Sequence, residues 1–263
     1  MPFPLPRLLS GTLALLLAAP LLCHAEKKED DWNVGIAVAA RSPLYAGESS
    51  KVIPFPYIAH EGEHFYVRGT MAGWKFYDND TFSVSAFVGF SFDGVDRKDF
   101  GRKALAAHGI NRDLLKNRNV GLDGGIAASL RSESAGELEL ELRSDVSGQS
   151  KGQSLTLDYS YPFQIGSVAV VPGVGVSMLS SKYANYYYGI LPSEVARGVP
   201  AYKPDAASVP HARVTVLAPI GDRWSGILGV NVDVLPKKLT DSPLVDDDTN
   251  AVPVVFVGVS RSF

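Results

Sequence analysis

The sequence has almost no cysteine, since Cys23 is the only one in 263 residues. Residues 26–263 therefore hold no thiol, which excludes disulfides and cysteine chemistry from that part of the chain. An excess of one charge is also lacking, because 25 lysines and arginines stand against 28 aspartates and glutamates. Without a basic excess, the composition gives no reason to expect a nucleic-acid partner.

Long hydrophobic runs are lacking too, with one exception near the start. The uncharged residues 8–22 follow Arg7 and precede Cys23-His24-Ala25, which is the order of a secretory signal peptide. We expect residues 1–25 to be removed and residues 26–263 to form one domain. Cys23 as a lipid acceptor is the alternative, but Leu22 before it is large for that role. No later run approaches the roughly 20 apolar residues of a spanning helix, so only a closed β-barrel would carry this chain through a membrane.

Alternation of apolar and polar residues is what the sequence does contain, and it predicts an all-β protein. In residues 137–143 every odd position is charged and every even position is leucine, the period of a strand with one wet face. Eleven segments show this period: 32–40, a strand ending near 60, 63–77, 82–90, 120–131, 137–143, 154–161, 167–179, 209–218, 223–235 and 251–263.

The odd number of segments is informative, because single-chain bacterial barrels have an even number of antiparallel strands. Counting back from the last strand places loops 91–119, 180–208 and 236–250 outside and the short turns in the periplasm, as such barrels require. The missing strand therefore lies before residue 78, where Pro54 and Pro56 are expected to bound a loop. We predict an antiparallel transmembrane barrel of the outer-membrane type with about twelve strands, and ten as the alternative.

The last segment, 251–263, suggests how the barrel closes and assembles. Val257 and Val259 share a face with Phe263, and a closing strand with a final aromatic is typical of proteins inserted by the barrel-assembly machinery. Arg261 lies two positions before Phe263, where an aromatic or aliphatic residue is expected. Aromatic residues near strand ends predict interfacial girdles in contact with outer-membrane lipid and lipopolysaccharide: Trp32, Tyr77, Tyr159, Tyr161, Trp224 and Phe263.

Several short motifs occur in a fixed order along the chain: Pro43-Leu-Tyr-Ala-Gly47, Pro54-Phe-Pro-Tyr57, Tyr183-Ala-Asn-Tyr-Tyr-Tyr-Gly189 with Glu194, Ala196, Gly198 and Tyr202, Ser242-Pro-Leu-Val245, and Phe263. This ordered set resembles the MltA-interacting protein / OmpV family of outer-membrane proteins. The resemblance implies a non-catalytic envelope protein without a cofactor. The resemblance implies a scaffold between a lytic transglycosylase and a penicillin-binding protein in one branch of the family, and an adhesin in other members. The predicted orientation leaves a periplasmic partner only the short turns and residues 26–31.

The strands with one wet face predict a polar lumen. If the leucines of residues 137–143 meet lipid, the opposite face lines the interior with Glu137, Glu139, Glu141, Arg143 and, on the next strand, Asp158. Twelve strands is near the size at which side chains either fill a lumen or leave it open. A filled lumen fits a scaffold, whereas an open one would make a passive channel for small solutes.

Tyrosines are concentrated in the predicted loop 180–208: Tyr183, Tyr186, Tyr187, Tyr188 and Tyr202. They have two interpretations. In the first, they pack the loop onto the barrel mouth or belong to an aromatic girdle. In the second, they form an outer recognition surface, since tyrosine supplies amphipathic contact area at low entropic cost.

No catalytic, cofactor-binding or metal-binding residue is predicted. His60-Glu-Gly-Glu-His64 has the spacing of a zinc protease, but that chemistry needs a helix, and Gly62 between two strands indicates a hairpin turn. His108 is expected in a loop and His211 in the lumen, and no Gly-x-Ser-x-Gly elbow accompanies them. The run Asp246–Asp248 is expected to be a solvated loop rather than a cation site.

Overall fold

The strands close into a barrel. A computed structural model describes residues 32–263, so the predicted signal peptide, residues 1–25, lies outside the described residues. Within that range β13 (Ala251–Ser262) pairs antiparallel with β1 (Trp32–Arg41), which joins the two ends of one sheet. Twelve antiparallel strands form the ring, and the short β9 (Phe163–Ile165) pairs only with the start of β10 (Val168–Leu179).

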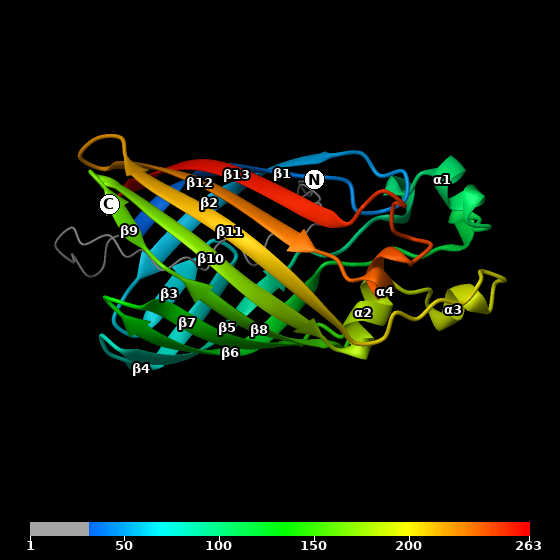
Figure 1. The fold of residues 1–263 in the computed structure, drawn as a ribbon, viewed down its shortest axis with the longest axis horizontal. Coiled ribbons are helices and arrows are strands. Elements are labelled where there is room, and N and C mark those ends of the chain that lie inside the picture. The colour runs from blue at the N-terminus through cyan, green and yellow to red at the C-terminus, as the bar shows by residue number, and fades with distance from the viewer. Residues whose placement is uncertain (1–31) are drawn as a thin grey trace, which may run out of the picture.

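The long loops lie at one end of this barrel and the short turns at the other (Figure 1). The remaining strands are β2 (Lys51–Glu61), β3 (Phe65–Arg68), β4 (Met71–Asp78), β5 (Phe82–Ser91), β6 (Gly121–Ser132), β7 (Gly136–Asp145), β8 (Gln153–Ser160), β11 (Ala207–Pro219) and β12 (Trp224–Val234). The loops contain α1 (Arg102–Ala107), α2 (Ser181–Tyr187), α3 (Pro192–Val195), α4 (Lys237–Thr240) and the 3-10 turns η2 (Arg97–Asp99) and η3 (Arg112–Leu114). We call the loop end the cap end and the opposite end the turn end. Within residues 32–263, no helix has the length and apolarity needed to cross a membrane.

The twelfth strand arises because the predicted third strand is divided into two strands. Residues 63–77 form β3 and β4, joined by a two-residue turn at Gly69 and Thr70. Gly69 has φ of 61°, a conformation that glycine adopts without steric cost and that tight hairpin turns require. The prediction of about twelve strands is confirmed, and the error did lie before residue 78.

The prediction that Pro54 and Pro56 bound a loop is wrong, because both lie inside β2. Within the described chain β3 reaches only the last three residues of β2, so Lys51–Tyr57 pairs with β1 alone. The carbonyl of Ile58 accepts a hydrogen bond from Gly69 N–H at 2.8 Å. Pro54 and Pro56 are separated from Ile58 by an even number of positions, so their backbone nitrogens face the same side of β2 as the Ile58 carbonyl. That side has no neighbouring strand along Lys51–Tyr57, so the missing N–H donors cost no hydrogen bond of the sheet.

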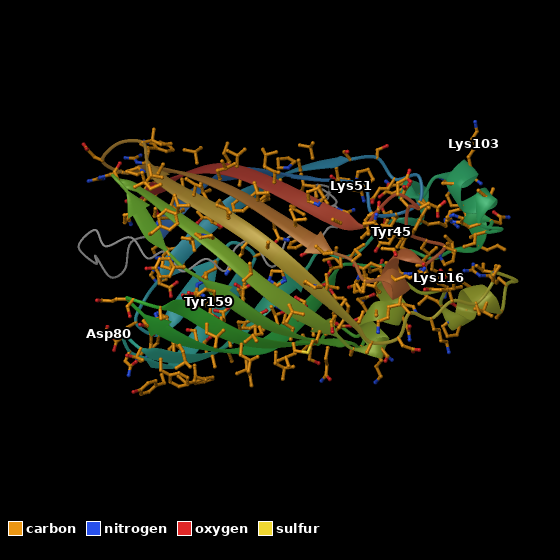
Figure 2. The ribbon with its side chains drawn as sticks, viewed as in Figure 1. Tyr45, Lys51, Asp80, Lys103, Lys116 and Tyr159 are labelled. Carbon is orange, nitrogen blue, oxygen red and sulfur yellow. The ribbon has the colours of Figure 1, made fainter. Side chains whose placement is uncertain are left out.

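The outward face of the barrel is apolar, and most of its exposed aromatic side chains collect at the turn end, whereas Phe90 lies near the cap end of β5. Those at the turn end are 40–66% exposed and comprise Trp32, Phe65, Trp74, Phe76, Tyr77, Tyr159, Tyr161, Phe163, Trp224 and Phe263. Figure 2 shows Tyr159 and Asp80 toward this end and Tyr45 and Lys51 toward the other. A belt of this kind is typical of the interface between lipid tails and water.

Three inward aromatic rings cover glycines on neighbouring strands. Tyr66 lies over Gly73, Phe87 over Gly125 and Phe256 over Gly229, each pair directly opposite in its ladder: β3 with β4, β5 with β6 and β13 with β12. The rings fill space that the missing side chains leave and shield the glycine backbone, which pins the strand register.

Gly229→Ala is expected to lower the free energy of unfolding by about 1–3 kcal/mol, the usual range for overpacking. A Cβ at Gly229 would lie 1.9 Å from Cε1 of Phe256, so the ring has to move. The urea midpoint of the heat-modifiable gel shift measures the loss. Gly221→Ala is the control, because nothing lies within 4 Å of that position. Equal midpoints for the two variants would contradict the packing described.

Candidate functional site

The cap is a packed layer across one end of the barrel. It consists of residues 42–50, 92–120, 180–206 and 235–250, and its apolar side chains share one buried cluster with inward residues at the strand ends. The cluster contains Leu44, Tyr45, Ala46, Val95, Phe100, Leu105, Ile110, Leu115, Ala184, Tyr187, Tyr188, Ile190, Val199, Ala207, Val209, Leu235, Leu239, Leu244, Val245 and Val252. Because four loops share one core, the cap is a folded lid rather than a set of separate loops.

A fully buried ion pair joins two of the cap loops. The Arg118 Nη1 and Nη2 atoms lie 2.7 Å and 2.9 Å from the two carboxylate oxygens of Glu194, and neither side chain is exposed. Glu194 also accepts hydrogen bonds from the backbone N–H groups of Lys116 and Leu191. Arg118 also donates to the carbonyl of Gly189 at 3.0 Å. The geometry is bidentate and both oxygens of Glu194 are hydrogen-bonded, as a buried pair requires, whereas the buried Arg118 Nε has no partner in the described chain.

A second network joins the cap to the barrel wall. Glu48 accepts from Arg41 of β1 at 2.8 Å, and the Lys51 ammonium of β2 lies 2.9 Å from the same carboxylate. Lys51 also contacts Asp99 of the next cap loop at 3.1 Å. The Lys51 ammonium therefore links Glu48, in the loop between β1 and β2, to the cap loop that contains Asp99.

The five predicted tyrosines all lie in the cap. The Tyr183 hydroxyl donates to Asp93, and the Tyr202 hydroxyl donates to the carbonyl of Lys238 at 2.9 Å. The Tyr186 hydroxyl accepts from the backbone N–H of Asn119 at 3.0 Å. Tyr187 and Tyr188 are buried in the cap core, and burial raises the pKa of both phenols above its usual range. These contacts pack the loops together, while recognition by the same tyrosines stays a prediction.

His108 makes one cap contact that depends on pH. Its Nδ1 lies 2.9 Å from the carbonyl oxygen of Pro243 and its Nε2 lies 3.1 Å from Asp247. The hydrogen bond to the Pro243 carbonyl, followed by that to Asp247, raises the pKa of His108. The contact should therefore stabilise the cap fully below the unfolded pKa of about 6.5. That contribution is lost as the pH rises through the higher folded value.

Hydrogen exchange in residues 242–248 at pH 6 and pH 8 tests this contact. We expect smaller protection factors at pH 8, after correction for the faster intrinsic exchange at higher pH, with a difference below about 1 kcal/mol because Asp247 is exposed. His108→Gln should remove the pH dependence specific to this contact. A wild-type difference that persists in His108→Gln would contradict the assignment.

The side chains predicted to line the lumen all point inward from β7 and β8. Glu137, Glu141 and Asp158 are buried, and Glu139 is half-buried between them on the same face. Arg143 donates two hydrogen bonds to Glu141. Asp158 accepts from Arg213 at 2.5 Å and lies 2.7 Å from Nε2 of His211. These contacts fill the middle of the lumen with paired charges.

Sequence reasoning missed several other inward charges. Asp123 on β6 and Asp233 on β12 share the lumen with the predicted set. Asp233 alternates with valines in residues 230–234, so the period used for the other strands contained the signal. Asp123 lies among glycines, where no period is visible. Arg118 and Glu194 belong to loops, and their pairing has no sequence signature.

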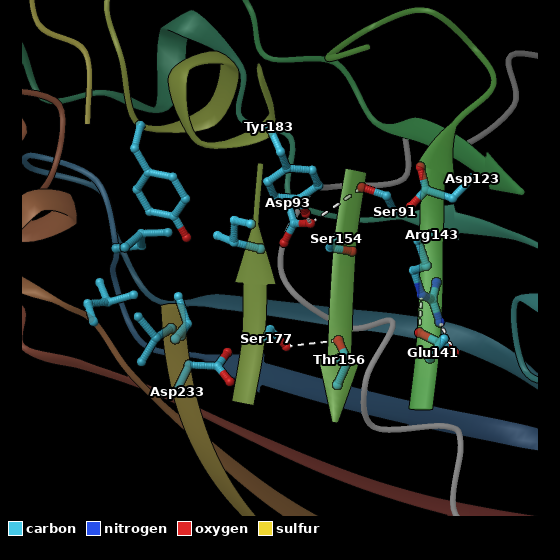
Figure 3. A pocket seen from close by; sticks show the side chains of 16 residues that line it. Ser91, Asp93, Asp123, Glu141, Arg143, Ser154, Thr156, Ser177, Tyr183 and Asp233 are labelled. Carbon is cyan, nitrogen blue, oxygen red and sulfur yellow. Dashed lines mark hydrogen bonds and ion pairs between the residues drawn. The ribbon is translucent and has the colours of Figure 1, made fainter. Parts of the chain in front are cut away.

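The lumen of the described chain contains a cap cavity and a turn cavity. The cap cavity lies beneath the cap, holds ≈ 740 Å³ of empty space including its opening to solvent, and is lined by Asp93, Asp123, Glu141, Arg143, Tyr188 and Asp233 among others. The turn cavity holds ≈ 410 Å³ measured in the same way and is lined by Glu61, Arg68, Lys75, Asp78, Arg131, Glu137 and Glu139 among others. Figure 3 shows the cap cavity, with Asp233 on one side and Asp123, Arg143 and Glu141 on the other.

The opposite wall of the lumen is apolar. A buried cluster on β1, β2, β12 and β13, with Phe92 after β5, contains Ala37, Ala39, Phe55, Tyr57, Ala59, Phe92, Ile227, Val254 and Phe256. The lumen therefore has one apolar and one charged side. Such a lumen suits a compact interior or an amphipathic ligand better than a uniformly wet pore.

The histidines within residues 32–263 do not form a metal or triad geometry. His60 stacks on Trp32 with ring centroids 4.4 Å apart, whereas His64 stacks on Trp74 at 5.5 Å. The segment between them is the end of β2 and a turn, as predicted. In the part of the chain that the structure describes, no three acidic or histidine side chains are grouped to hold a metal ion.

Comparison with known proteins gives matches along nearly the whole chain. The model of the family described as MltA-interacting protein MipA matches residues 34–263. The putative outer membrane protein YiaT of Escherichia coli O157:H7 is 28% identical over 260 residues, which is 97% of this chain and 100% of that protein. The MltA-interacting protein of Escherichia coli K12 is 27% identical over 253 residues, covering 95% and 97%. Among solved structures, the NanC porin gives a TM-score of 0.46 at 7% identity, covering 87% of this chain and 100% of that one.

Proposed function

Because the chain belongs to the MltA-interacting protein MipA family of outer-membrane proteins, we propose that it is a non-catalytic binding and scaffold protein of the cell envelope. The observation that carries this proposal is the folded cap, whose four loops share one apolar core over the end of the barrel. A barrel closed in this way presents two surfaces and offers no wide path between them.

The turn end is the surface proposed for a periplasmic partner, with the cap outside. Its exposed turn residues are mainly acidic: Glu63, Asp80, Glu133 and Asp222 against Arg223. A partner with a basic docking surface would complement this rim, and complementary charge favours fast and specific association. The family name, and one relative named for its interaction with MltA, support a murein enzyme in this position.

Affinity capture with the full chain in detergent tests the proposal. We expect a lytic transglycosylase, with or without a penicillin-binding protein, to be retained at low salt and released as ionic strength rises. Neutralising the rim with Glu63→Gln, Asp80→Asn, Glu133→Gln and Asp222→Asn should abolish retention. The matched control neutralises Asp247 and Asp248 on the cap. Equal retention by both variants, or no murein enzyme at all, would contradict the scaffold role.

A passive channel is the second candidate function, and the two cavities in the lumen favour it. Small solutes would have to pass the cap core and the paired charges around Asp158. Adhesion through the cap surface, the remaining alternative from the family resemblance, would place binding at the cap instead of the rim. If the wild type retains the murein enzyme and only the rim variant loses it, the result supports the scaffold over the channel and the adhesin.

A further inference from the structure

The cap cavity is more acidic than its single cation can balance. The carboxylates of Asp93, Asp123, Glu141 and Asp233 line it, and Arg143 is the one basic residue in its lining. Arg143 is already paired with Glu141 through two hydrogen bonds. The carboxylates of Asp123 and Asp233 give the cavity a negative field, which low-dielectric walls strengthen.

Two mostly buried polar groups line this cavity and have no hydrogen-bond partner in the described chain. Asp123 is 5% exposed, and its carboxylate makes no hydrogen bond within residues 32–263. Tyr188 is 9% exposed, and its hydroxyl likewise makes no hydrogen bond in the described chain. Buried polar groups are nearly always hydrogen-bonded. Because these two have no such bond, their hydrogen-bonding capacity is available to a ligand.

The rest of the lining is partly apolar. Leu44, Val209, Leu235 and Val252 come from the cap and the strand ends, next to Leu179 of β10. Asp123 and Asp233 lie on different strands on opposite sides of the cavity (Figure 3). The described carboxylates are not grouped as metal ligands, so the charge distribution fits an elongated organic cation better than a metal ion.

We infer that the cap cavity is a binding site for an organic cation with an aliphatic body, of the alkylamine or diamine class. One ammonium group would contact Asp123, and the other would contact Asp233 and the Tyr188 hydroxyl across the cavity. The methylene chain would lie against Leu235 and Val252. The site is separate from the turn-end rim and does not rest on the scaffold role.

Isothermal titration calorimetry with octane-1,8-diamine and the full chain in neutral detergent tests this site. We expect saturable binding of the diamine and none of octane-1,8-diol, which has the same length without charge. Asp123→Asn should weaken binding about tenfold, the effect of one partly buried charge contact. Tyr188→Phe should weaken it about threefold, as loss of one neutral hydrogen bond does.

The matched control is Asp80→Asn, which removes an exposed carboxylate at the turn end. Its affinity for the diamine should equal that of the wild type. Equal losses in Asp123→Asn and Asp80→Asn would show non-specific charge attraction and overturn the inference. Binding of the diol, or no saturable binding of the diamine, would also overturn it. If Asp123→Asn fails to assemble, Tyr188→Phe and the diol comparison still decide the outcome.

Discussion

Arg118→Ala is expected to unfold the cap while the barrel stays assembled. The substitution leaves the Glu194 carboxylate buried and unpaired, and breaking a fully buried pair costs about 3–5 kcal/mol. Much of that cost falls on the two loops that the pair joins, residues 92–120 and 180–206. The ladders of the barrel do not involve either side chain. Hydrogen exchange across the cap loops, together with heat-modifiable migration of the barrel, measures the two effects separately.

Arg102→Ala is the matched control, because it removes an arginine from the same loop. Arg102 pairs with Asp113 at the surface, where both side chains are about half exposed. Surface pairs of this kind contribute little to stability. Cap exchange should be unchanged in Arg102→Ala. If the cap loops of Arg118→Ala are as well protected from hydrogen exchange as those of the wild type, the buried pair does not hold the cap together.

Phe263→Ala is expected to reduce the fraction of chains that reach the assembled barrel. The backbone N–H of Phe263 donates to the carbonyl of Trp32 at 3.0 Å, at the seam between β13 and β1. The ring is 66% exposed on the outer face, and the Arg261 guanidinium lies 5.2 Å from its centroid. Removing the ring loses about 2 kcal/mol of the free energy gained when the apolar side chain leaves water. It also removes the aromatic group proposed to be recognised by the assembly machinery. Heat-modifiable migration in outer-membrane fractions measures the assembled fraction.

Phe263→Tyr is the control for this position, since it keeps the ring and its size. We expect near-normal assembly of that variant. Val257 and Val259, the other proposed elements of the signal, share the outward face with Phe263. Normal assembly of Phe263→Ala would show that the seam closes without the aromatic and would remove the assembly role.

The barrel was predictable because its strands carry the two-residue period. The glutamates and leucines of residues 137–143 separate cleanly between lumen and outer face, and the count of segments pointed to the region of the error. The turn at Gly69 and Thr70 escaped because alternation appears continuous across it. Pro54 and Pro56 suggested a loop because proline normally interrupts a ladder, and only the open edge of β2 explains their place in a strand.

Packing of the cap was predicted only as one interpretation of the tyrosines in residues 180–208, because the other apolar residues of the cap loops follow no regular period. Val95, Phe100, Leu105, Ile110 and Leu115 are all buried, and each is five residues from the next. That spacing matches neither the strand nor the helix period. Their packing depends on contacts with three other loops that are distant in sequence. Asp123 and Tyr188 line the same cavity only because of this tertiary arrangement.

Conductance across a planar bilayer is the most direct test of the closed, capped barrel. Wild-type protein is expected to give no regular current steps, because the cap core covers one end of the barrel and the paired charges around Asp158 occupy the lumen. Arg118→Ala, reconstituted in the same way, is expected to give steps as the cap loosens. Regular, reproducible steps from the wild type, equal to those of Arg118→Ala, would contradict the account and favour the channel.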